Sequence, residues 1–150
     1  MFKQITAALD GSPNSIKALD YAAHIASQDN ATLQIISVIE PLPVIYGGAS
    51  TAAYNEANQS VMEKNYQKIQ TEQRARLKKQ YPKLKITTII KEGRPSTKIT
   101  ESSLDSDLIV IGHRGHGGVR NWILGSVAKQ IVDQCTAPVL VVKDPDYCQA

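Results

Sequence analysis

Short apolar runs alternate along the chain with segments of helical periodicity. The apolar runs are rich in Ile, Val, Leu or Ala and lie at residues 2–9, 31–40, 83–93, 107–112 and 137–143. Runs of this length, bounded by Gly, Pro, Asn or Asp, are typical of β-strands. The run DLIVIG at 107–112 is continuously apolar, which is typical of a strand buried on both faces of a parallel sheet.

The segments between the runs predict four helices. The first begins at Ser12, a capping residue, and Pro13 follows at the first helical position. The second covers about 51–81 and is expected to be long and largely exposed, because its apolar stripe is narrow: Met62, Tyr66, Ile69 and Leu77. The last helix is predicted from about Ser126 to Gln134.

Two further segments complete the pattern. PLPVIYGGAS at 41–50 contains two prolines and two adjacent glycines, which predict a mobile loop. The third helix is predicted to begin at Pro95, with Ile99 and Leu104 facing the core.

Strict alternation of strand and helix predicts an α/β fold in a single domain over residues 1–150. We expect a five-stranded parallel sheet sandwiched by four helices, because right-handed crossovers place helices on both faces. The predicted strand order is 3-2-1-4-5. In such sheets ligands bind beyond the carboxyl ends of the strands where the winding reverses. Asp10 and Gly112, which end the first and fourth strands, would then share one crevice.

Composition and charge exclude several classes of protein. Apolar residues make up 42% of the 150 residues, and no stretch approaches the roughly 20 apolar residues that span a bilayer. The start, MFKQITAALDGS, lacks the segments of a signal peptide, and Cys135 and Cys148 have no neighbours at metal-ligand spacing. We therefore expect a cytoplasmic protein with free thiols.

The excess of basic residues is small. Lys and Arg number 17 and Asp and Glu 14, which is too slight an imbalance to indicate a nucleic-acid-binding protein. Basic residues gather between Glu63 and Lys85, where a solvated helix face is expected. Aromatic residues are only 5% of the chain, so bases of a single strand would find few stacking partners.

The segment GHRGHGGVRNWILGS, residues 112–126, carries the main candidate chemistry. Its glycines lack side chains, so backbone N–H groups can approach a ligand closely: Gly115, Gly117 and Gly118. Gly125 and Ser126 open a helix, where the first N–H groups lack internal partners and the helix dipole is positive. These features predict a phosphate-binding site, to which Arg114 and Arg120 would add positive charge.

Two common phosphate loops are absent from the sequence. The pattern GxxxxGK[ST] needs a lysine after Gly117, where Gly118 stands. The first strand is followed by DGSPNS and not by GxGxxG, so NAD or FAD at the usual site is not expected.

The spacing Gly112-x2-Gly115-x9-Gly125-Ser126 resembles the G-x2-G-x9-G-[S/T] ATP-binding signature of universal stress proteins. The segments LDGS, EGRP, DLIVIG, LGSVAKQIV and APVLVV also resemble that family, and the likeness extends over residues 2–143. The resemblance implies a Rossmann-like fold of the kind found in adenine nucleotide alpha-hydrolases.

The resemblance also implies a role for each matching position. Asp10 would face the ribose or a phosphate-bound Mg²⁺ ion, and Ala8 and Val38 would border the adenine of ATP. The ribose and phosphates would be held by residues of the glycine loop and the helix after it: Gly112, Gly115, Gly125, Ser126 and Val127. The loop residues Arg114 and Gly117 are added as binding candidates by the chemistry described above, not by the resemblance.

Family members commonly form dimers through the last strand, whose edge would otherwise stay open. The resemblance therefore implies a homodimer through the residues of that strand: Val139, Leu140, Val141 and Val142. His113 and His116 depart from the family pattern, because they are bulky and polar for such a loop. They would alter the phosphate pocket or confer pH sensitivity, and a metal site is not expected because no third ligand lies nearby in the sequence.

Purely structural interpretations of the same residues stay open. Asp10 would then stabilise the turn that follows the first strand, as Asp often does. Ser126 would be a plain helix cap, and the glycine loop a generic turn.

Three classes of function are compatible with these observations. The first is an ATP-binding regulatory protein of the stress response, which hydrolyses ATP slowly at most and signals to an unidentified protein partner. The second is an adenylyl-transferring enzyme, although DGSPNS is a poor version of the glycine-serine loop that such enzymes carry after the first strand. The third is a binder of another nucleotide such as cyclic AMP, or an interaction module without a ligand.

Overall fold

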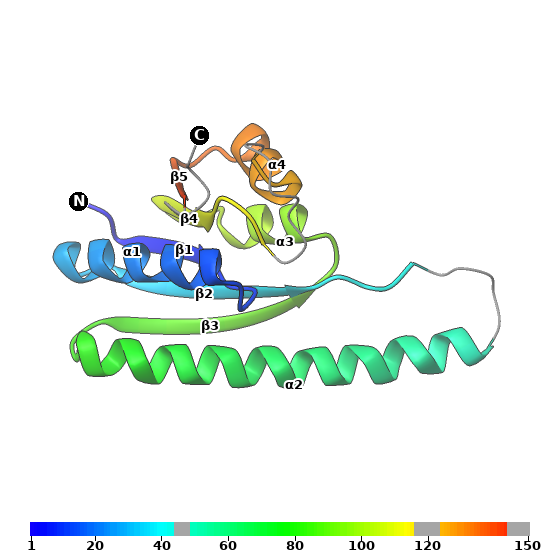
Figure 1. The fold of residues 1–150 in the computed structure, drawn as a ribbon. Helices are drawn as coiled ribbons and strands as arrows, with labels where there is room; N and C mark the ends of the chain where they lie inside the picture. Colours follow the sequence, from blue (N-terminus) through cyan, green and yellow to red (C-terminus); the bar gives the residue numbers. More distant parts are fainter. Residues whose placement is uncertain (44–48, 116–123, 144–150) are drawn as a thin grey trace, which may run out of the picture.

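The computed structural model describes residues 1–43, 49–115 and 124–143. A parallel sheet with the order β3-β2-β1-β4-β5 lies at its centre, which confirms the predicted order (Figure 1). The elements in chain order are β1 (Gln4–Ala8), α1 (Pro13–Asp29), β2 (Thr32–Ile39), α2 (Ala49–Gln80), β3 (Lys85–Glu92), α3 (Pro95–Ser102), β4 (Leu108–Gly112), α4 (Ser126–Gln134) and β5 (Val139–Val142).

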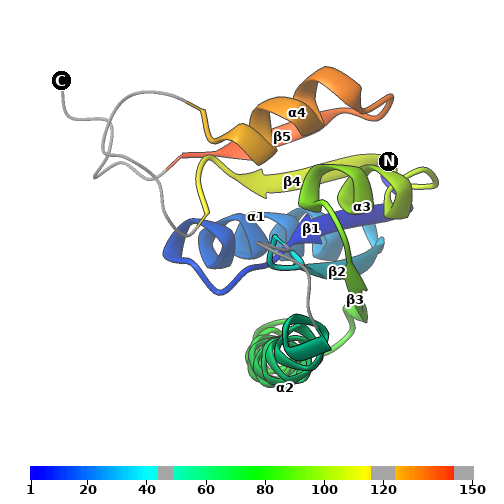
Figure 2. The same cartoon turned by 90° about the vertical axis from the view of Figure 1, so that its right-hand side faces the viewer.

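Helices cover both faces of the sheet, as predicted. α1 contacts β1 and β4, and α2 contacts β2 and β3; α3 and α4 lie side by side on the opposite face (Figure 2). β4 lies between these layers, so its alternate residues enter two different cores. Leu108 and Val110 pack with residues of α1, whereas Ile109 and Ile111 pack with residues of α3 and α4.

Both ends of α1 follow from its sequence. Ser12 caps the helix, because its Oγ accepts a hydrogen bond from the Ser15 N–H at 3.2 Å, and Pro13 occupies the first turn. Asn30 ends the helix in the left-handed conformation, with a φ of 54°, which asparagine tolerates better than most residues. The predicted start of this helix is confirmed.

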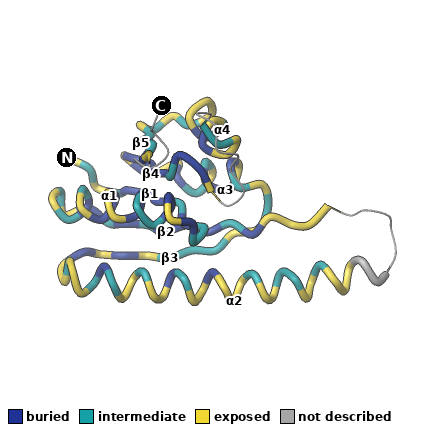
Figure 3. Tube along the Cα trace, in the orientation of Figure 1, coloured by how far each residue is buried: buried dark blue, intermediate teal, exposed yellow. Residues whose placement is uncertain are grey.

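The long helix α2 extends past the sheet. Its 32 residues span about 48 Å, whereas the eight residues of β2 or β3 span about 26 Å. The first turns of α2 therefore project beyond the strands (Figure 1), and its outer side is exposed (Figure 3). The helix begins at Ala49, inside the predicted 41–50 loop, of which residues 44–48 lie outside the described residues.

The prediction that Leu104 faces the core is wrong. Its side chain is 71% exposed, because α3 ends at Ser102 and the chain turns before Leu104. Ser103 helps to end the helix: its Oγ donates to the Ile99 carbonyl at 2.6 Å.

Asp107 joins the starts of two neighbouring strands. Its Oδ2 accepts hydrogen bonds from the N–H groups of Lys3 and Gln4, at 2.7 and 2.9 Å, and its own N–H donates to the Gln4 carbonyl at 2.9 Å. The Gln4 and Lys3 N–H groups hold the pKa of the Asp107 carboxyl below its usual value, because they stabilise the charged form.

The substitution Asp107→Asn is expected to lower the stability of the fold near neutral pH, because it removes the charge that these two N–H groups bind. A carboxyl with a lowered pKa in the folded state contributes stability above its unfolded pKa of about 3.9 and loses it as the pH falls through the folded pKa. The gap in urea midpoint between wild type and variant should therefore be present near pH 6 and largely closed by about pH 3.

Asp105→Asn is the matched control, since it removes the same charge from an exposed residue two positions away. A gap for Asp107→Asn that stays the same at both pH values would contradict this account of the carboxylate.

Candidate functional site

A cavity of about 810 Å³ opens beyond the carboxyl ends of β1, β2 and β4. Its walls are the residues that end these strands, the first turn of α4 and one side of α2. The volume is in the range of about 300–1,000 Å³ that is typical of small-molecule sites. It lies where the winding of the sheet reverses, which is the place that the predicted strand order indicated.

Asp10 lines this cavity, two residues after the end of β1. Its Oδ1 accepts the Ser12 N–H at 2.8 Å, and its own N–H donates to Ser15 Oγ at 3.3 Å. Asp10 therefore stabilises the turn into α1, as the structural interpretation expected. Its second oxygen is directed at the loop after β4: a Cβ atom on Gly115 would lie 2.5 Å from Asp10 Oδ2. The exits of β1 and β4 thus share one crevice.

Gly112 has a packing role of its own. A Cβ atom at this position would lie 2.9 Å from the Asn14 carbonyl carbon and 3.0 Å from its oxygen. Real Cβ atoms do not approach backbone so closely, so any side chain here would push the first turn of α1 away from β4. Gly112 therefore brings the beginning of α1 close to the cavity.

The chain returns after the glycine loop to the point where it left the sheet. The Gly125 N–H donates to the His113 carbonyl at 3.0 Å, and a Cβ atom on Gly125 would lie 3.2 Å from the same oxygen. Five of the residues singled out in the sequence lie outside the described residues: His116, Gly117, Gly118, Arg120 and Cys148.

The first turn of α4 faces the cavity without a side-chain cap. Gly125 occupies the cap position and has no side chain to offer, so the alternative of Ser126 as the cap is wrong. The cavity is lined by residues of this turn: Gly125, Ser126, Val127 and Ala128. The N–H groups that begin a helix and the positive end of its dipole together attract anions.

Two basic side chains beside this turn are buried. His113 and Arg114 line the cavity, and each is only 7% exposed. Burial lowers the pKa of His113, and the positive charges of Arg114 and Lys143 lower it further, so the neutral imidazole is favoured at neutral pH. Among the described residues, the buried Nδ1 atom of His113 has no hydrogen-bond partner.

Apart from Ser15, Glu40 and Tyr66, the rest of the cavity wall is apolar. Ala8 and Val38 are half-buried and line it at the ends of β1 and β2. Aliphatic side chains from the sheet and from α3 and α4 extend the same wall: Ile36, Ile99, Ile111 and Ile131. The cavity therefore offers an anion-binding end at α4 and an apolar surface at β1 and β2.

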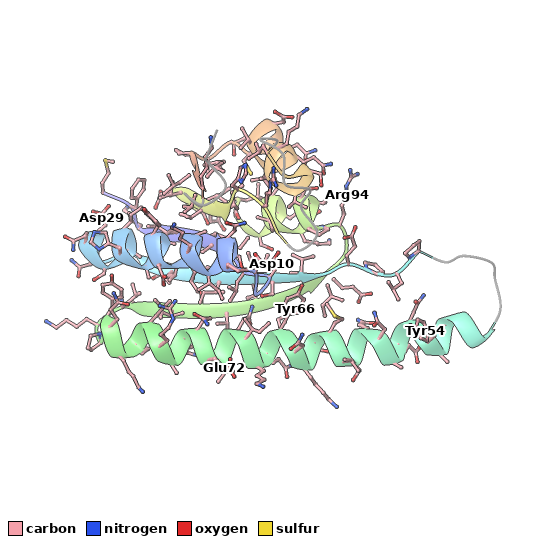
Figure 4. The ribbon with its side chains drawn as sticks, in the orientation of Figure 1. Asp10, Asp29, Tyr54, Tyr66, Glu72 and Arg94 are labelled. Carbon is pink, nitrogen blue, oxygen red and sulfur yellow. The ribbon has the colours of Figure 1, made fainter. Side chains whose placement is uncertain are left out.

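Sequence reasoning missed the contribution of α2. Met62 and Tyr66 line the cavity, whereas the sequence placed them only in a core stripe. Figure 4 shows Tyr66 rising from α2 toward the sheet, below the end of β1 that carries Asp10. Burial raises the pKa of Tyr66, and the negative charge of Asp10 raises it further. In the sequence, the only indication that α2 contributes to the cavity was a tyrosine in a mostly polar helix.

Two other kinds of site were searched for in the described parts of the chain. Within them, no three His, Cys, Asp or Glu side chains are grouped so as to hold a metal ion. No helix in residues 1–43, 49–115 and 124–143 has the length and apolar character to cross a membrane.

Comparisons of sequence place this architecture among known proteins. Residues 1–143 match the universal stress protein family. The chain is 36% identical over 141 residues to universal stress protein A homolog 1 of Coxiella burnetii, covering 94% of this chain and 96% of that protein. It is 30% identical over 151 residues to universal stress protein YxiE of Bacillus subtilis, covering 95% and 100%.

Solved structures share the fold at lower identity. Universal stress protein UspA from Lactobacillus plantarum superposes with a TM-score of 0.84 at 20% identity, over 93% of this chain and 97% of that one. A universal stress protein in complex with cAMP superposes with a TM-score of 0.66 at 24% identity, over 95% and 97%. With a match that covers residues 1–143, the chain belongs to the universal stress protein family.

Proposed function

We propose that this chain binds ATP together with Mg²⁺ in the cavity and acts as a regulatory protein. The observation that carries the proposal is the approach of Gly115 to Asp10 beside the uncapped first turn of α4. That arrangement brings backbone N–H groups, a carboxylate and an apolar wall into one cavity. An anionic chain attached to a flat apolar base has the matching chemistry. The cytoplasmic location stays a prediction.

The anionic end of the cavity suits a chain of phosphates. The first turn of α4 would bind phosphate oxygens through its N–H groups, and the exposed Ser126 hydroxyl is available as a further donor. Arg114 adds a buried positive charge to the same wall. The unpartnered Nδ1 of His113 would find a partner in a ligand group, since a buried polar atom is costly when unpaired.

Asp10 suits a metal ion that arrives with the nucleotide. Mg²⁺ is usually held by one or two carboxylates together with substrate phosphates and water, and not by a full set of protein ligands. A carboxylate of the cavity wall, such as Asp10, therefore satisfies what the chain itself must supply. The ion would neutralise phosphate charge next to Asp10, which would otherwise repel it.

The apolar wall suits adenine. Ala8 lies on β1, which neighbours β4, and Val38 lies on β2, which is one strand further away. Both are therefore within two strands of the side of the cavity at which α4 begins. Neighbouring strands are about 4.8 Å apart, so the wall is within reach of a nucleotide whose phosphates lie at α4.

The glycine loop gives the first test of this function. Gly115→Val places a Cβ atom against Asp10 Oδ2 and bulk in the cavity, so ATP affinity should fall about tenfold or more. Isothermal titration calorimetry with ATP, ADP, AMP and cyclic AMP measures it on the folded protein. Ala53→Val, an exposed change on α2, is the control. Unchanged ATP binding by Gly115→Val would remove the glycine loop from the site.

Cyclic AMP is the second candidate ligand, because a structural neighbour is a complex with cAMP. Its single phosphate carries less charge toward α4 than a triphosphate, so ATP is expected to bind more tightly. Tighter binding of cyclic AMP in the same titration would favour it. The structure does not favour an adenylyl-transfer enzyme: Ser12 and Ser15, in the turn after β1, use their hydroxyls to start α1.

Bound ATP is expected to be hydrolysed slowly at most. Two carboxylates line the cavity: Asp10 is already bonded to the Ser12 N–H, and Glu40 follows β2, two strands away from the α4 side. Among the described residues, neither is an obvious general base aimed at a terminal phosphate. A steady-state phosphate-release assay with Mg²⁺ should give a turnover number far below the roughly 10 per second of a median enzyme. Tens of turnovers per second would identify an enzyme instead.

We also propose a homodimer through β5. β5 is an edge strand, and its bonds to β4 use the Pro138 and Val142 carbonyls. In a parallel pair alternate residues bond to one neighbour, so the main chain of Val139 and Val141 faces the open edge. An edge of this kind can be closed by pairing with a second chain.

Val141→Pro removes an N–H from that open edge while leaving the bonds to β4 in place. The wild type is expected to sediment as a dimer and the variant as a folded monomer in analytical ultracentrifugation. Tyr54→Phe, on the far side of the sheet, should sediment like the wild type. A wild-type monomer, or a variant that stays dimeric, would place the interface elsewhere.

A further inference from the structure

Tyr66 brings a hydroxyl into the cavity from an element that the glycine signature does not include. It is 8% exposed and lines the cavity together with Met62, Asp10 and the ends of β1 and β2. Among the described residues, no hydrogen-bond partner is found for its phenol oxygen. A phenol that is buried against the core yet unpaired at a cavity wall is a donor available to a ligand.

The position of Tyr66 is fixed by a buried hydrogen-bond network one helical turn away. Gln70 is 4% exposed, and its Nε2 donates to Ser37 Oγ at 3.0 Å and to the Ile89 carbonyl at 2.9 Å. Ser37 Oγ in turn donates to the Leu9 carbonyl at 2.7 Å, and Leu9 directly precedes Asp10. The network ties this turn of α2 to β1, β2 and β3, so Tyr66 is held in place before any ligand arrives.

Tyr66 and Asp10 offer complementary hydrogen-bonding groups. Both side chains line the cavity, and a tyrosine phenol keeps its proton near neutral pH, so Tyr66 is a donor there. An ionised carboxylate only accepts hydrogen bonds, whereas each ribose hydroxyl donates one and accepts others. A donor and an acceptor facing one cavity therefore match a ribose diol.

The order of the strands places the sugar between these two groups. With phosphates at the first turn of α4 beside β4 and the base over β2, the sugar lies over the end of β1, which is the strand between them. Asp10 lies two residues beyond the end of that strand. The argument rests on the ATP site proposed above.

We propose that Tyr66 is a ribose-binding residue, whose hydroxyl donates to a ribose hydroxyl while the Asp10 carboxylate accepts from the same diol. A carboxylate has about four acceptor sites, so Asp10 can accept from the diol as well as from the Ser12 N–H and still face the metal ion. The residue would make the site selective for ribonucleotides over deoxyribonucleotides. Sites built to hydrogen-bond a substrate hydroxyl discriminate strongly against an analogue that lacks it.

The test is calorimetry of the full chain with ATP, 2′-deoxy-ATP and 3′-deoxy-ATP, each with Mg²⁺. Tyr66→Phe keeps the ring and its packing and removes only the donor. It should weaken ATP binding about five- to tenfold, the loss that one neutral hydrogen bond implies. At least one of the deoxynucleotides should bind wild type and Tyr66→Phe equally, because the partner hydroxyl is already missing.

Tyr54→Phe is the matched control, since it makes the same change on the same helix at a tyrosine that is 65% exposed. Thermal unfolding without ligand checks that Tyr66→Phe folds. If it does not fold, the wild type alone still decides: it should prefer ATP over one deoxynucleotide by about fivefold, and equal affinity for all three would overturn the proposal.

Two results separate this inference from the proposed function. If the wild type binds ATP and Tyr66→Phe binds it equally well, or loses all three nucleotides to the same extent, the ribose contact is wrong and the ATP site stands. If the wild type binds no adenine nucleotide, the proposed function fails and the ribose contact fails with it.

Discussion

The site depends on how closely the ends of β1 and β4 approach each other. They are neighbours in the sheet only because the chain crosses over after β3 and returns to the other side of β1. The polar residues after both strands then meet at one edge, where Gly115 lies so close to Asp10 that a side chain at 115 would strike the carboxylate. Gly112 imposes the same constraint on α1, since it lets the Asn14 backbone lie against β4. Two glycines thus fix the spacing between a carboxylate, a helix start and the loop after β4.

Most of the fold could be predicted from the sequence because its determinants are local. Ser12 caps α1 and Pro13 is its first residue, so the helix begins where the capping pattern predicts. The continuous apolar run of β4 is buried on both faces of the sheet. Alternation and handedness leave few topologies, and the order 3-2-1-4-5 was assumed among them; the structure confirms it. Leu104 was misplaced because its burial depends on where α3 ends, and that end is set by hydrogen bonds of Ser103 and not by an apolar period.

The candidate site was predicted less completely, because a cavity collects residues from elements that are distant in sequence. Gly112, Gly115, Gly125 and Asp10 were found through spacing and resemblance, and they line the cavity. Tyr66 was assigned only to a core stripe, since periodicity reports which face of a helix is buried and not what that face meets. The burial of Arg114 could not be predicted from the sequence either, because an arginine in a glycine-rich loop ordinarily points into water.

The composition of the cavity wall also bears on what ligand binding would accomplish. A site made of helix N–H groups, two buried basic side chains, a turn-stabilising carboxylate and a mostly aliphatic surface suits the binding and orientation of a ligand, but offers little to activate a water molecule. Any effect of the ligand must then come from a difference in its affinity for two arrangements of the chain. α2 is the element through which such a difference would act. It lines the cavity at Met62 and Tyr66, is tied to β2 and β3 through Gln70, and projects past the sheet. A ligand that contacts Met62 or Tyr66 would thereby act on α2, a helix whose far end is exposed.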